Sequence, residues 1–176
     1  MTKTQPTRHR MLAAVLPLML AACASPPAVT WPAALAPADS EAWLMTAAAR
    51  GVQIYECRAS ASGGAWAFVA PEAELFDDAS HPIGKHGAGP AWQALDGSWV
   101  EGKLVARADA PAADAIPWLL LSTRDAGPAG RFSRVTHIRR INTVGGVAPR
   151  SGCNADSLGA TARVPYTADY LLYTTR

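Results

Sequence analysis

The chain has 176 residues, of which 49% are hydrophobic and 17% are charged. This length and composition suit one folded domain and are short for two. The formal net charge of +2 supplies no strong basic field, so we expect no nucleic-acid partner.

The N-terminal stretch has the composition of an export signal. Lys3, Arg8 and Arg10 precede an apolar run, Met11 to Ala22, that is far shorter than the roughly 20 residues of a membrane-spanning helix. The basic start, the short apolar run and the small residues before Cys23 resemble the bacterial lipoprotein signal. The resemblance implies cleavage of residues 1–22 and a lipid anchor, palmitate included, on the Cys23 sulfur. The alternative is an ordinary secretory signal that is cut elsewhere, and both interpretations export the chain.

The residues after the cysteine indicate where the protein is held. Ala24 and Ser25 follow Cys23 without an aspartate, which in lipoproteins of this type implies the outer membrane, facing the periplasm. Removal of the signal leaves 13 basic and 14 acidic residues, a net charge of −1. The apparent basicity of the chain therefore belongs to its signal.

Two cysteines are left once Cys23 is assigned to lipid. Cys57 and Cys153 form an exported pair, for which we expect a disulfide. In the chain-entropy model a loop of this length contributes roughly 4 to 5 kcal/mol of stability. The alternative is two separate buried thiols. A metal site on this pair is disfavoured because neither cysteine lies in a C-x-x-C spacing or beside a histidine.

Residues 23–40 carry Pro26, Pro27, Pro32 and Pro37 among alanines, a composition typical of a tether. We expect the folded domain to span residues 41–176. Residues 41–50 suit either a short alanine-rich helix or a strand.

From Gly51 onward, short apolar or alternating runs are separated by Gly, Pro and Asp, a pattern typical of β proteins. The Asp96-Gly97 pair is a strong hairpin signal, and residues 77–90 are expected to form a long loop. Within the strand after Asp96-Gly97, apolar even positions from Val100 to Ala108 predict one dry face. The expected strands are 52–58, 65–69, 91–95, 98–109, 116–121, 133–142 and 164–174. We therefore expect a single all-β domain, an antiparallel β-sandwich or flattened barrel with one disulfide.

Several stretches are specific enough to point to a family. In order they are GVQIYEC, GKHGAGPAW, DGSWVEGK, IPWLLL, VTHIRRINTVGG and VPYTADYLLY. Together they resemble DUF3455, a domain of unknown function found in secreted proteins of bacteria and fungi, over about residues 51–173. The resemblance implies no mechanism. Cys57 and Cys153 lie within or close to these stretches, which fits the expected disulfide.

The polar candidates for chemistry are few. Asp77, Asp78, His81 and His86 lie close together in the sequence, but their spacing matches no standard metal motif, so we expect a polar loop, no metal and no cofactor. The run 84–90 is rich in glycine without the order of a phosphate-binding loop, and it suits a tight turn or the rim of a pocket.

The arginines Arg134, Arg139 and Arg140 could bind a carboxylate or phosphate, although a solvated strand face is the favoured interpretation. Six large aromatic side chains could line a concave apolar pocket or, more commonly, fill a core; they are Trp66, Trp92, Trp99, Trp118, Tyr166 and Tyr170. The candidate pocket comprises His86, Trp92, Trp118, Arg139 and Tyr166.

Two functional hypotheses follow. The first is a non-enzymatic envelope lipoprotein that binds a small apolar ligand or an envelope protein. The second is a hydrolase-like periplasmic enzyme with a pocket around His86 and His137, although no G-x-S-x-G motif is present. The second requires both histidines and an acid to converge on one cleft.

Overall fold

The computed structural model describes residues 1–2, 31–61 and 63–176. The expected export signal after residue 2, Cys23 and the first part of the expected tether lie outside these residues. The chain divides into two units, Met1–Thr30 and Trp31–Arg176, and everything below concerns the second. Across the described ranges, no helix has the length and apolar character needed to cross a membrane.

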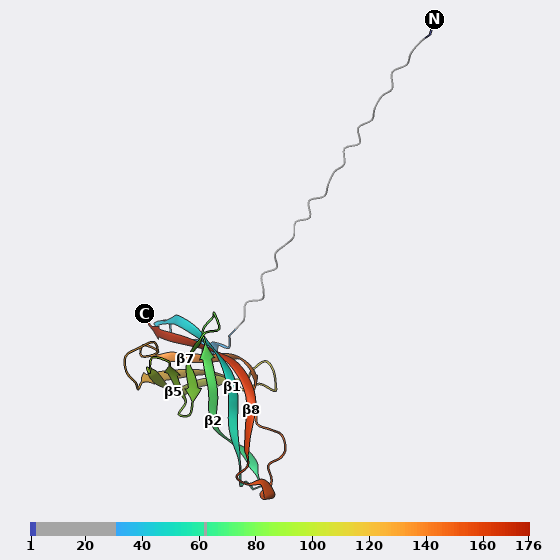
Figure 1. Cartoon of the computed structure of the whole chain (residues 1–176), viewed down its shortest axis with the longest axis vertical. Coiled ribbons are helices and arrows are strands. Elements are labelled where there is room, and N and C mark those ends of the chain that lie inside the picture. Colours follow the sequence, from blue (N-terminus) through green and yellow to red (C-terminus); the bar gives the residue numbers. More distant parts are fainter. Residues whose placement is uncertain (3–30, 62) are drawn as a thin grey trace. The chain divides into compact units, whose positions relative to one another are not determined.

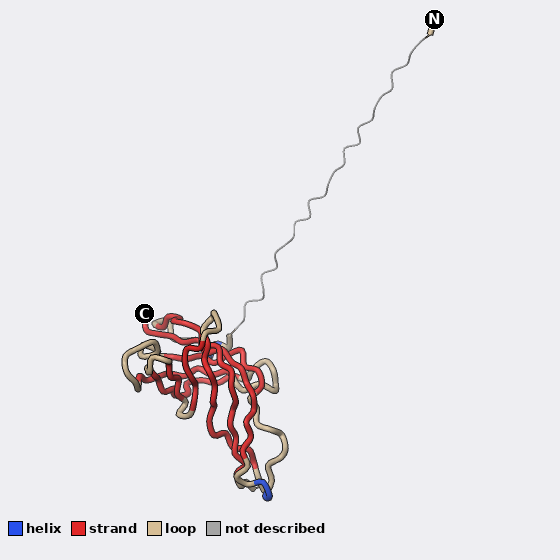
Figure 2. The backbone as a smooth tube through the Cα atoms, viewed as in Figure 1, coloured by secondary structure: helices blue, strands red, loops and turns tan. Residues whose placement is uncertain are grey.

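Antiparallel strands of the second unit form one closed barrel (Figures 1 and 2). Each strand pairs with the next along the chain, and the last strand returns to pair with the first. The expected all-β fold is confirmed, and of the two architectures proposed the barrel is the one formed. The strands are β1 (Glu41–Arg58), β2 (Ala65–Phe76), β3 (Pro82–Gly87), β4 (Ala91–Ala94), β5 (Trp99–Ala108), β6 (Trp118–Asp125), β7 (His137–Gly145) and β8 (Thr161–Thr175), with two short 3-10 helices, η1 (Ala33–Leu35) and η2 (Ala155–Ser157).

The alanine-rich segment 41–50, which suits either a helix or a strand, is the first half of β1. Strand β1 pairs with β8 from Glu41 to Glu56 and with β2 from Ala48 to Arg58. Ala47 and Ala49 point into the core and are almost fully buried. Strand pairing on both sides therefore overrides the local helix propensity of the alanines. Figure 1 shows β1, β2 and β8 as long neighbouring arrows.

The prediction of a loop over residues 77–90 is wrong, because Pro82–Gly87 forms β3 between β2 and β4. Gly84 explains why the strand is hard to recognise. A Cβ atom at this position would lie 2.2 Å from the carbonyl oxygen of Gln93 on β4. The glycine is thus required by close approach of two strands and does not mark a turn.

A β-bulge lies between Leu104 and Ala106 on β5. Leu104 and, beyond the bulge, Arg107 both face the barrel interior, whereas Ala106 and Ala108 pack on the outside. Because of the extra residue, even-numbered side chains face the interior before the bulge and the exterior after it. The expected dry face running from Val100 to Ala108 is therefore divided between interior and exterior.

The segment before β1 packs against the outside of the barrel. Leu35 in η1 is completely buried, and Trp31 contacts Trp118 with a ring-centroid distance of 5.8 Å. Leu120 and Ile141 complete this outer apolar cluster. The packed unit therefore begins earlier than the expected start at residue 41, because two large apolar side chains of the Pro/Ala-rich segment find a partner surface.

One end of the barrel is filled by apolar side chains and covered by the loop between β6 and β7. Phe132 and Val135 of this loop are buried in the interior core. The β4–β5 hairpin holds the loop in place, since Asp96 accepts a hydrogen bond from the Arg131 backbone N–H at 2.7 Å and the Ser98 hydroxyl accepts one from Phe132 N–H at 3.1 Å. Any space inside the barrel must therefore lie toward the other end.

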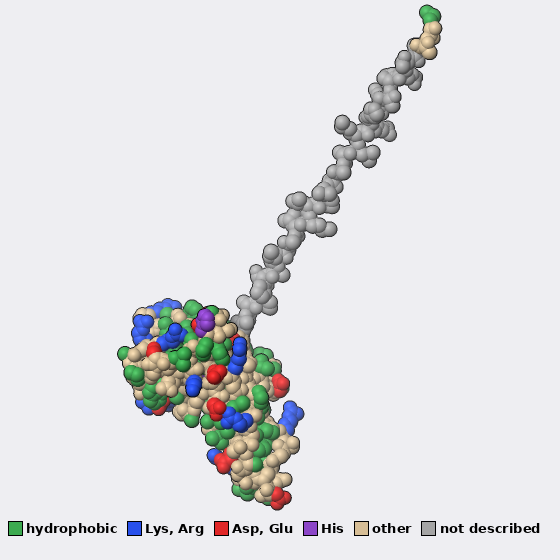
Figure 3. All heavy atoms as spheres, viewed as in Figure 1, with side chains coloured by type: hydrophobic (Ala, Val, Ile, Leu, Met, Phe, Trp, Pro, Cys, Tyr) green, Lys and Arg blue, Asp and Glu red, His purple; other side chains and the backbone are tan. Residues whose placement is uncertain are grey.

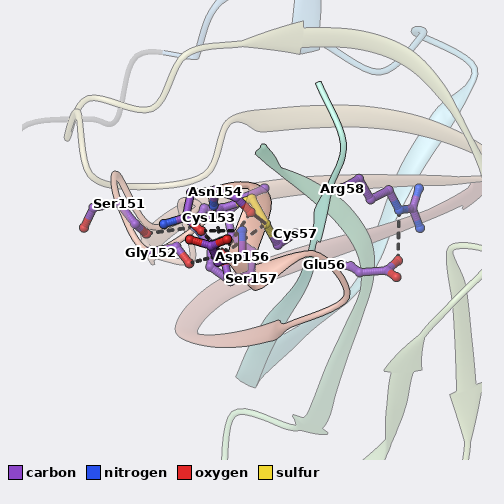
Figure 4. The surroundings of a disulfide bond; sticks show 10 residues. Glu56, Cys57, Arg58, Ser151, Gly152, Cys153, Asn154, Asp156 and Ser157 are labelled. Carbon is purple, nitrogen blue, oxygen red and sulfur yellow. Dashed lines mark hydrogen bonds and ion pairs between the residues drawn. A yellow bond between two sulfur atoms is a disulfide. The ribbon is translucent and has the colours of Figure 1, made fainter. Parts of the chain in front are cut away.

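The expected disulfide between Cys57 and Cys153 is confirmed (Figure 4). It joins the end of β1 to the β7–β8 loop, with the two Cα atoms 5.3 Å apart. Next to it, the Asn154 side chain accepts a hydrogen bond from Asp156 N–H at 2.9 Å and caps η2. The cross-link therefore ties down the longest connection of the barrel.

Candidate binding cavity

A cavity of about 1030 Å³ opens at the end of the barrel opposite the β6–β7 loop. Its walls come from all eight strands, together with the loop between β5 and β6. This volume lies just above the range of about 300–1,000 Å³ that is typical of small-molecule sites. Eight-stranded barrels are wide enough either to be filled by side chains or to hold one small ligand.

The wall of the cavity is mostly apolar. Leu119 and Leu121 of β6 point inward, together with Ile116 just before this strand. Four further apolar side chains line the cavity and are also 41% to 55% exposed, which places them at its mouth; they are Phe68, Val69, Leu104 and Val147. An apolar molecule entering the barrel would therefore meet apolar surface from the mouth inward.

His86 is buried in the wall between aromatic rings. It stacks on Trp92 at 4.2 Å between ring centroids and meets Tyr170 edge-on at 5.0 Å. Burial lowers the pKa of His86 to about 3, and the nearby positive charge of Arg140 also lowers it. Because Nδ1 lies 2.9 Å from the carbonyl oxygen of Ala91, which can only accept, the neutral ring carries its proton on Nδ1 and leaves Nε2 as an acceptor.

Three tyrosines place hydroxyl groups in or beside the cavity. Tyr55 donates to the carbonyl oxygen of Gly146 at 2.7 Å, and the hydroxyls of Tyr166 and Tyr170 lie 3.4 Å apart. Burial raises the pKa of Tyr55, Tyr166 and Tyr170, whereas the charge of Arg140 opposes that shift in each case. These hydroxyls are therefore neutral hydrogen-bonding groups in the wall.

Two buried nitrogen donors in the cavity wall lack partners among the described residues. The Gln53 side chain is 2% exposed and its Nε2 makes no hydrogen bond, although the amide is close enough to Tyr166 to lower the pKa of that hydroxyl. Trp92 Nε1 is likewise unpartnered. Buried polar groups without partners are rare and costly, so a bound molecule or water is expected to satisfy them.

Arg140 brings a positive charge into this apolar space. Its Nε and Nη2 donate to the carbonyl oxygen of Pro117 at 3.0 and 2.9 Å, and its cross-strand neighbours are Leu119 and Tyr170, which also line the cavity. No carboxylate of the described chain forms an ion pair with Arg140. The charge is therefore held by a backbone carbonyl and left uncompensated.

The structure separates the five residues of the expected pocket. His86 and Trp92 line the cavity, and Tyr166 is buried beside Tyr170 in the interior core. Trp118 and Arg139 lie on the outer face, where the Arg139 guanidinium packs between the rings of Trp31 and Tyr173 at 5.2 and 5.3 Å.

The arginines also depart from the favoured interpretation of a solvated strand face. Arg139 is buried on the outside and Arg140 faces the cavity, because neighbouring strand residues point to opposite faces. Arg134 lies before β7 and is exposed.

The two histidines of the enzyme hypothesis do not converge. His86 lies in the cavity wall, whereas His137 is absent from it and lies with Nδ1 3.1 Å from the carboxylate of Glu41, at the start of β1. The described residues that line the cavity include no serine, threonine or cysteine. The pocket required by that hypothesis, around both histidines, is therefore not formed.

The polar residues of segment 77–86 are also apart. Asp77 accepts hydrogen bonds from the backbone N–H groups of Ala79 and His81, and these bonds lower the pKa of Asp77. His86 is buried in the barrel. Over the described residues, no group of three or more His, Cys, Asp or Glu side chains is placed to hold a metal ion.

The sequence analysis did not single out Gln53, and it favoured a solvated position for Arg140, which instead lines the cavity. On the face drawn in Figure 3, acidic and basic side chains are interspersed over the folded unit, as on an ordinary solvated surface. The position of Arg140, two residues after the buried Ile138, was the available signal that it faces inward. In the same way, Gln53 lies on the same face of β1 as the buried Ala49 and Tyr55.

Comparison with known proteins places the chain in a family. A family model described as "Protein of unknown function (DUF3455)" matches residues 37–174, which confirms the resemblance. Neither a curated protein nor a solved structure matches the chain.

Proposed function

Since the chain belongs to the DUF3455 family, whose function is unknown, we propose from its geometry that the barrel binds a small, mostly apolar molecule in its cavity. The observation that carries the proposal is a cavity of about 1030 Å³ with an apolar wall, an exposed apolar mouth and a few inward polar groups. This combination is typical of small-molecule sites.

A binding role is preferred to catalysis on chemical grounds. His86 is held neutral by burial, with a pKa of about 3, far below the range that suits a general base near neutral pH. The described lining also offers no serine, threonine or cysteine nucleophile. The polar groups of the wall are suited to orienting a ligand by hydrogen bonds.

Titration with the neutral fluorescent dye N-phenyl-1-naphthylamine tests this proposal. We expect the dye to bind and brighten, and the variant Leu104→Trp to weaken binding at least about tenfold, because Leu104 faces the interior opposite Leu121 and an indole there would occupy ligand space. Val105→Trp is the matched control, since Val105 is the next residue on the same strand, is 56% exposed against 55% for Leu104, and does not line the cavity. Absence of dye binding to the wild-type protein, or equal effects of the two variants, would contradict the proposal.

We also propose that the barrel is held at the cell envelope by lipid on Cys23, most simply at the periplasmic face of the outer membrane. The support is the sequence alone: a basic start, an apolar run and small residues that lead directly into the cysteine. An anchor would keep a ligand-binding barrel at a membrane surface.

The anchor is tested by Cys23→Ser. We expect this variant to lose metabolic labelling with palmitate and to move from the membrane fraction to the soluble fraction. Ser25→Ala is the control and should remain labelled and membrane-bound. Unchanged membrane attachment of the Cys23→Ser variant would refute the anchor.

A further inference from the structure

The lining of the cavity carries an unbalanced positive charge. Its charged side chains are Arg107, Asp109 and Arg140. Arg107 and Asp109 lie 4.0 Å apart and are both mostly exposed, so that these two charges offset one another near solvent. Arg140, at the cross-strand position between Leu119 and Tyr170, keeps a full charge without an acidic partner among the described residues.

The guanidinium is oriented with donors to spare. An arginine side chain has five N–H donors in a fixed planar fork. Two of those on Arg140 go to the Pro117 carbonyl oxygen, one from Nε and one from Nη2, and the guanidinium also lies close enough to the Tyr170 hydroxyl to oppose the rise in its pKa. The backbone contact therefore fixes the plane of the group and leaves an unused pair of donors of the kind that binds a carboxylate.

A second set of free donors lies in the same wall. Gln53 Nε2 and Trp92 Nε1 are both buried and unpartnered. Gln53 neighbours Tyr166, the hydroxyl of Tyr166 is 3.4 Å from that of Tyr170, and Tyr170 is the cross-strand neighbour of Arg140. The wall thus has a surplus of donors next to a cation, and a bound acceptor would satisfy them.

We propose that the ligand is an apolar monocarboxylate, whose carboxylate binds Arg140 and the free donors beside it while its apolar body lies against the cavity wall. This inference rests on the proposed binding function and adds the chemical class of the ligand. One uncompensated cation matches a single negative charge. A phosphate dianion would keep an excess negative charge in an apolar space, which is unfavourable.

The experiment compares dodecanoate with dodecanol, which share the same apolar chain, as competitors for the bound neutral dye at a pH that ionises the acid. We expect the wild-type protein to bind dodecanoate at least about tenfold more tightly than dodecanol, the effect of a charge-assisted hydrogen bond in a partly dry site. We expect Arg140→Gln to remove that preference and Arg163→Gln to keep it. Arg163 is the control for charge, because it pairs with Glu72 on the surface and does not line the cavity.

The outcomes separate this inference from the proposed function. If dodecanol competes as well as dodecanoate in the wild-type protein, or if Arg140→Gln keeps the preference, the cavity binds apolar molecules but the carboxylate inference is wrong. If neither compound competes and the dye itself does not bind, the proposed function fails and the inference falls with it. The wild-type comparison requires no substitution, so the inference stays testable even if Arg140→Gln does not fold.

Discussion

Two adjacent arginines on β7 illustrate how strand geometry decides the role of a residue. Arg139 packs between two aromatic rings on the outside of the barrel, where cation–π contacts and burial hold it. Arg140 enters the cavity and is anchored by the Pro117 carbonyl. The same residue type one position apart is structural in the first case and available for a ligand in the second. Only the alternation of the strand distinguishes them.

His86 makes stability depend on pH in a predictable direction. Its pKa in the folded protein is about 3, against an ordinary value of 6.5, so between these pH values the unfolded chain binds a proton that the folded protein does not. The free energy of unfolding should therefore fall as pH decreases from about 6.5 towards 3, by about 1.4 kcal/mol per pH unit for this proton. Urea denaturation over that pH range measures the slope.

The variant His86→Phe isolates this contribution. A phenyl ring can keep the stacking on Trp92 but cannot titrate, and it loses the hydrogen bond to the Ala91 carbonyl. We expect a less stable protein at neutral pH with a shallower loss of stability in acid. The carboxylates, which are the same in both proteins, contribute equally to the two pH slopes, so the difference between the slopes reports His86. An unchanged slope in His86→Phe would show that His86 already takes up a proton in the folded state.

Glycines on strands report how closely the elements approach. At Gly51 on β1, a Cβ atom would lie 2.1 Å from the Glu72 carbonyl oxygen and 2.5 Å from the Ala73 Cα on β2. At Gly87 on β3, a Cβ atom would meet nothing within 4 Å. The two positions therefore form a matched pair for testing strand packing.

We expect Gly51→Ala to lower the free energy of unfolding by about 1–3 kcal/mol, because backbone atoms of β2 must move to admit the methyl group. Gly87→Ala should change it by less than about 0.5 kcal/mol. Chemical denaturation of both variants gives the comparison. Equal stability of the two variants would mean that β1 and β2 are not packed as closely as described.

At the scale of elements, the sequence predicted local features and missed those set by distant partners. The Asp96-Gly97 hairpin is confirmed. Asp96 accepts a hydrogen bond from the backbone N–H of Ser98, two residues later, and Gly97 adopts φ 87°, so both features depend on residues close in the sequence. β3 was missed because Gly84 and Lys85 resemble a turn until β4 is placed beside them. The docking of Leu35 likewise depends on an outer surface that no local pattern describes.

At the scale of the molecule, closure of the barrel creates the candidate site. Pairing of β8 with β1 removes the free sheet edges and encloses an interior that the β6–β7 loop fills at one end only. The sequence pattern indicated a β fold with abundant aromatic residues, and His86 and Trp92, two residues of the expected pocket, line the cavity. Gln53 and Arg140 could not be assigned to that cavity without knowing which strands meet across it and which end stays open.

The disulfide shows the opposite case, in which a distant contact could be predicted. If Cys23 is set aside for lipid, Cys57 and Cys153 are the two remaining cysteines of the chain. Their pairing can therefore be predicted from the number of cysteines, without knowledge of the fold. Chemical identity thus predicted a contact between residues 96 positions apart, whereas hydrophobic pattern could not.

The most direct test of ligand binding in the cavity is a nitrogen–proton NMR titration of the protein with dodecanoate. Gln53 Nε2 and Trp92 Nε1 are unpartnered donors in the cavity wall, and Trp118 Nε1 is an unpartnered, buried donor on the outer face. We predict large shifts of the Gln53 side-chain amide and the Trp92 indole resonance, with little change at Trp118. Shifts confined to Trp118 or to surface residues, or no shifts at all, would contradict the account.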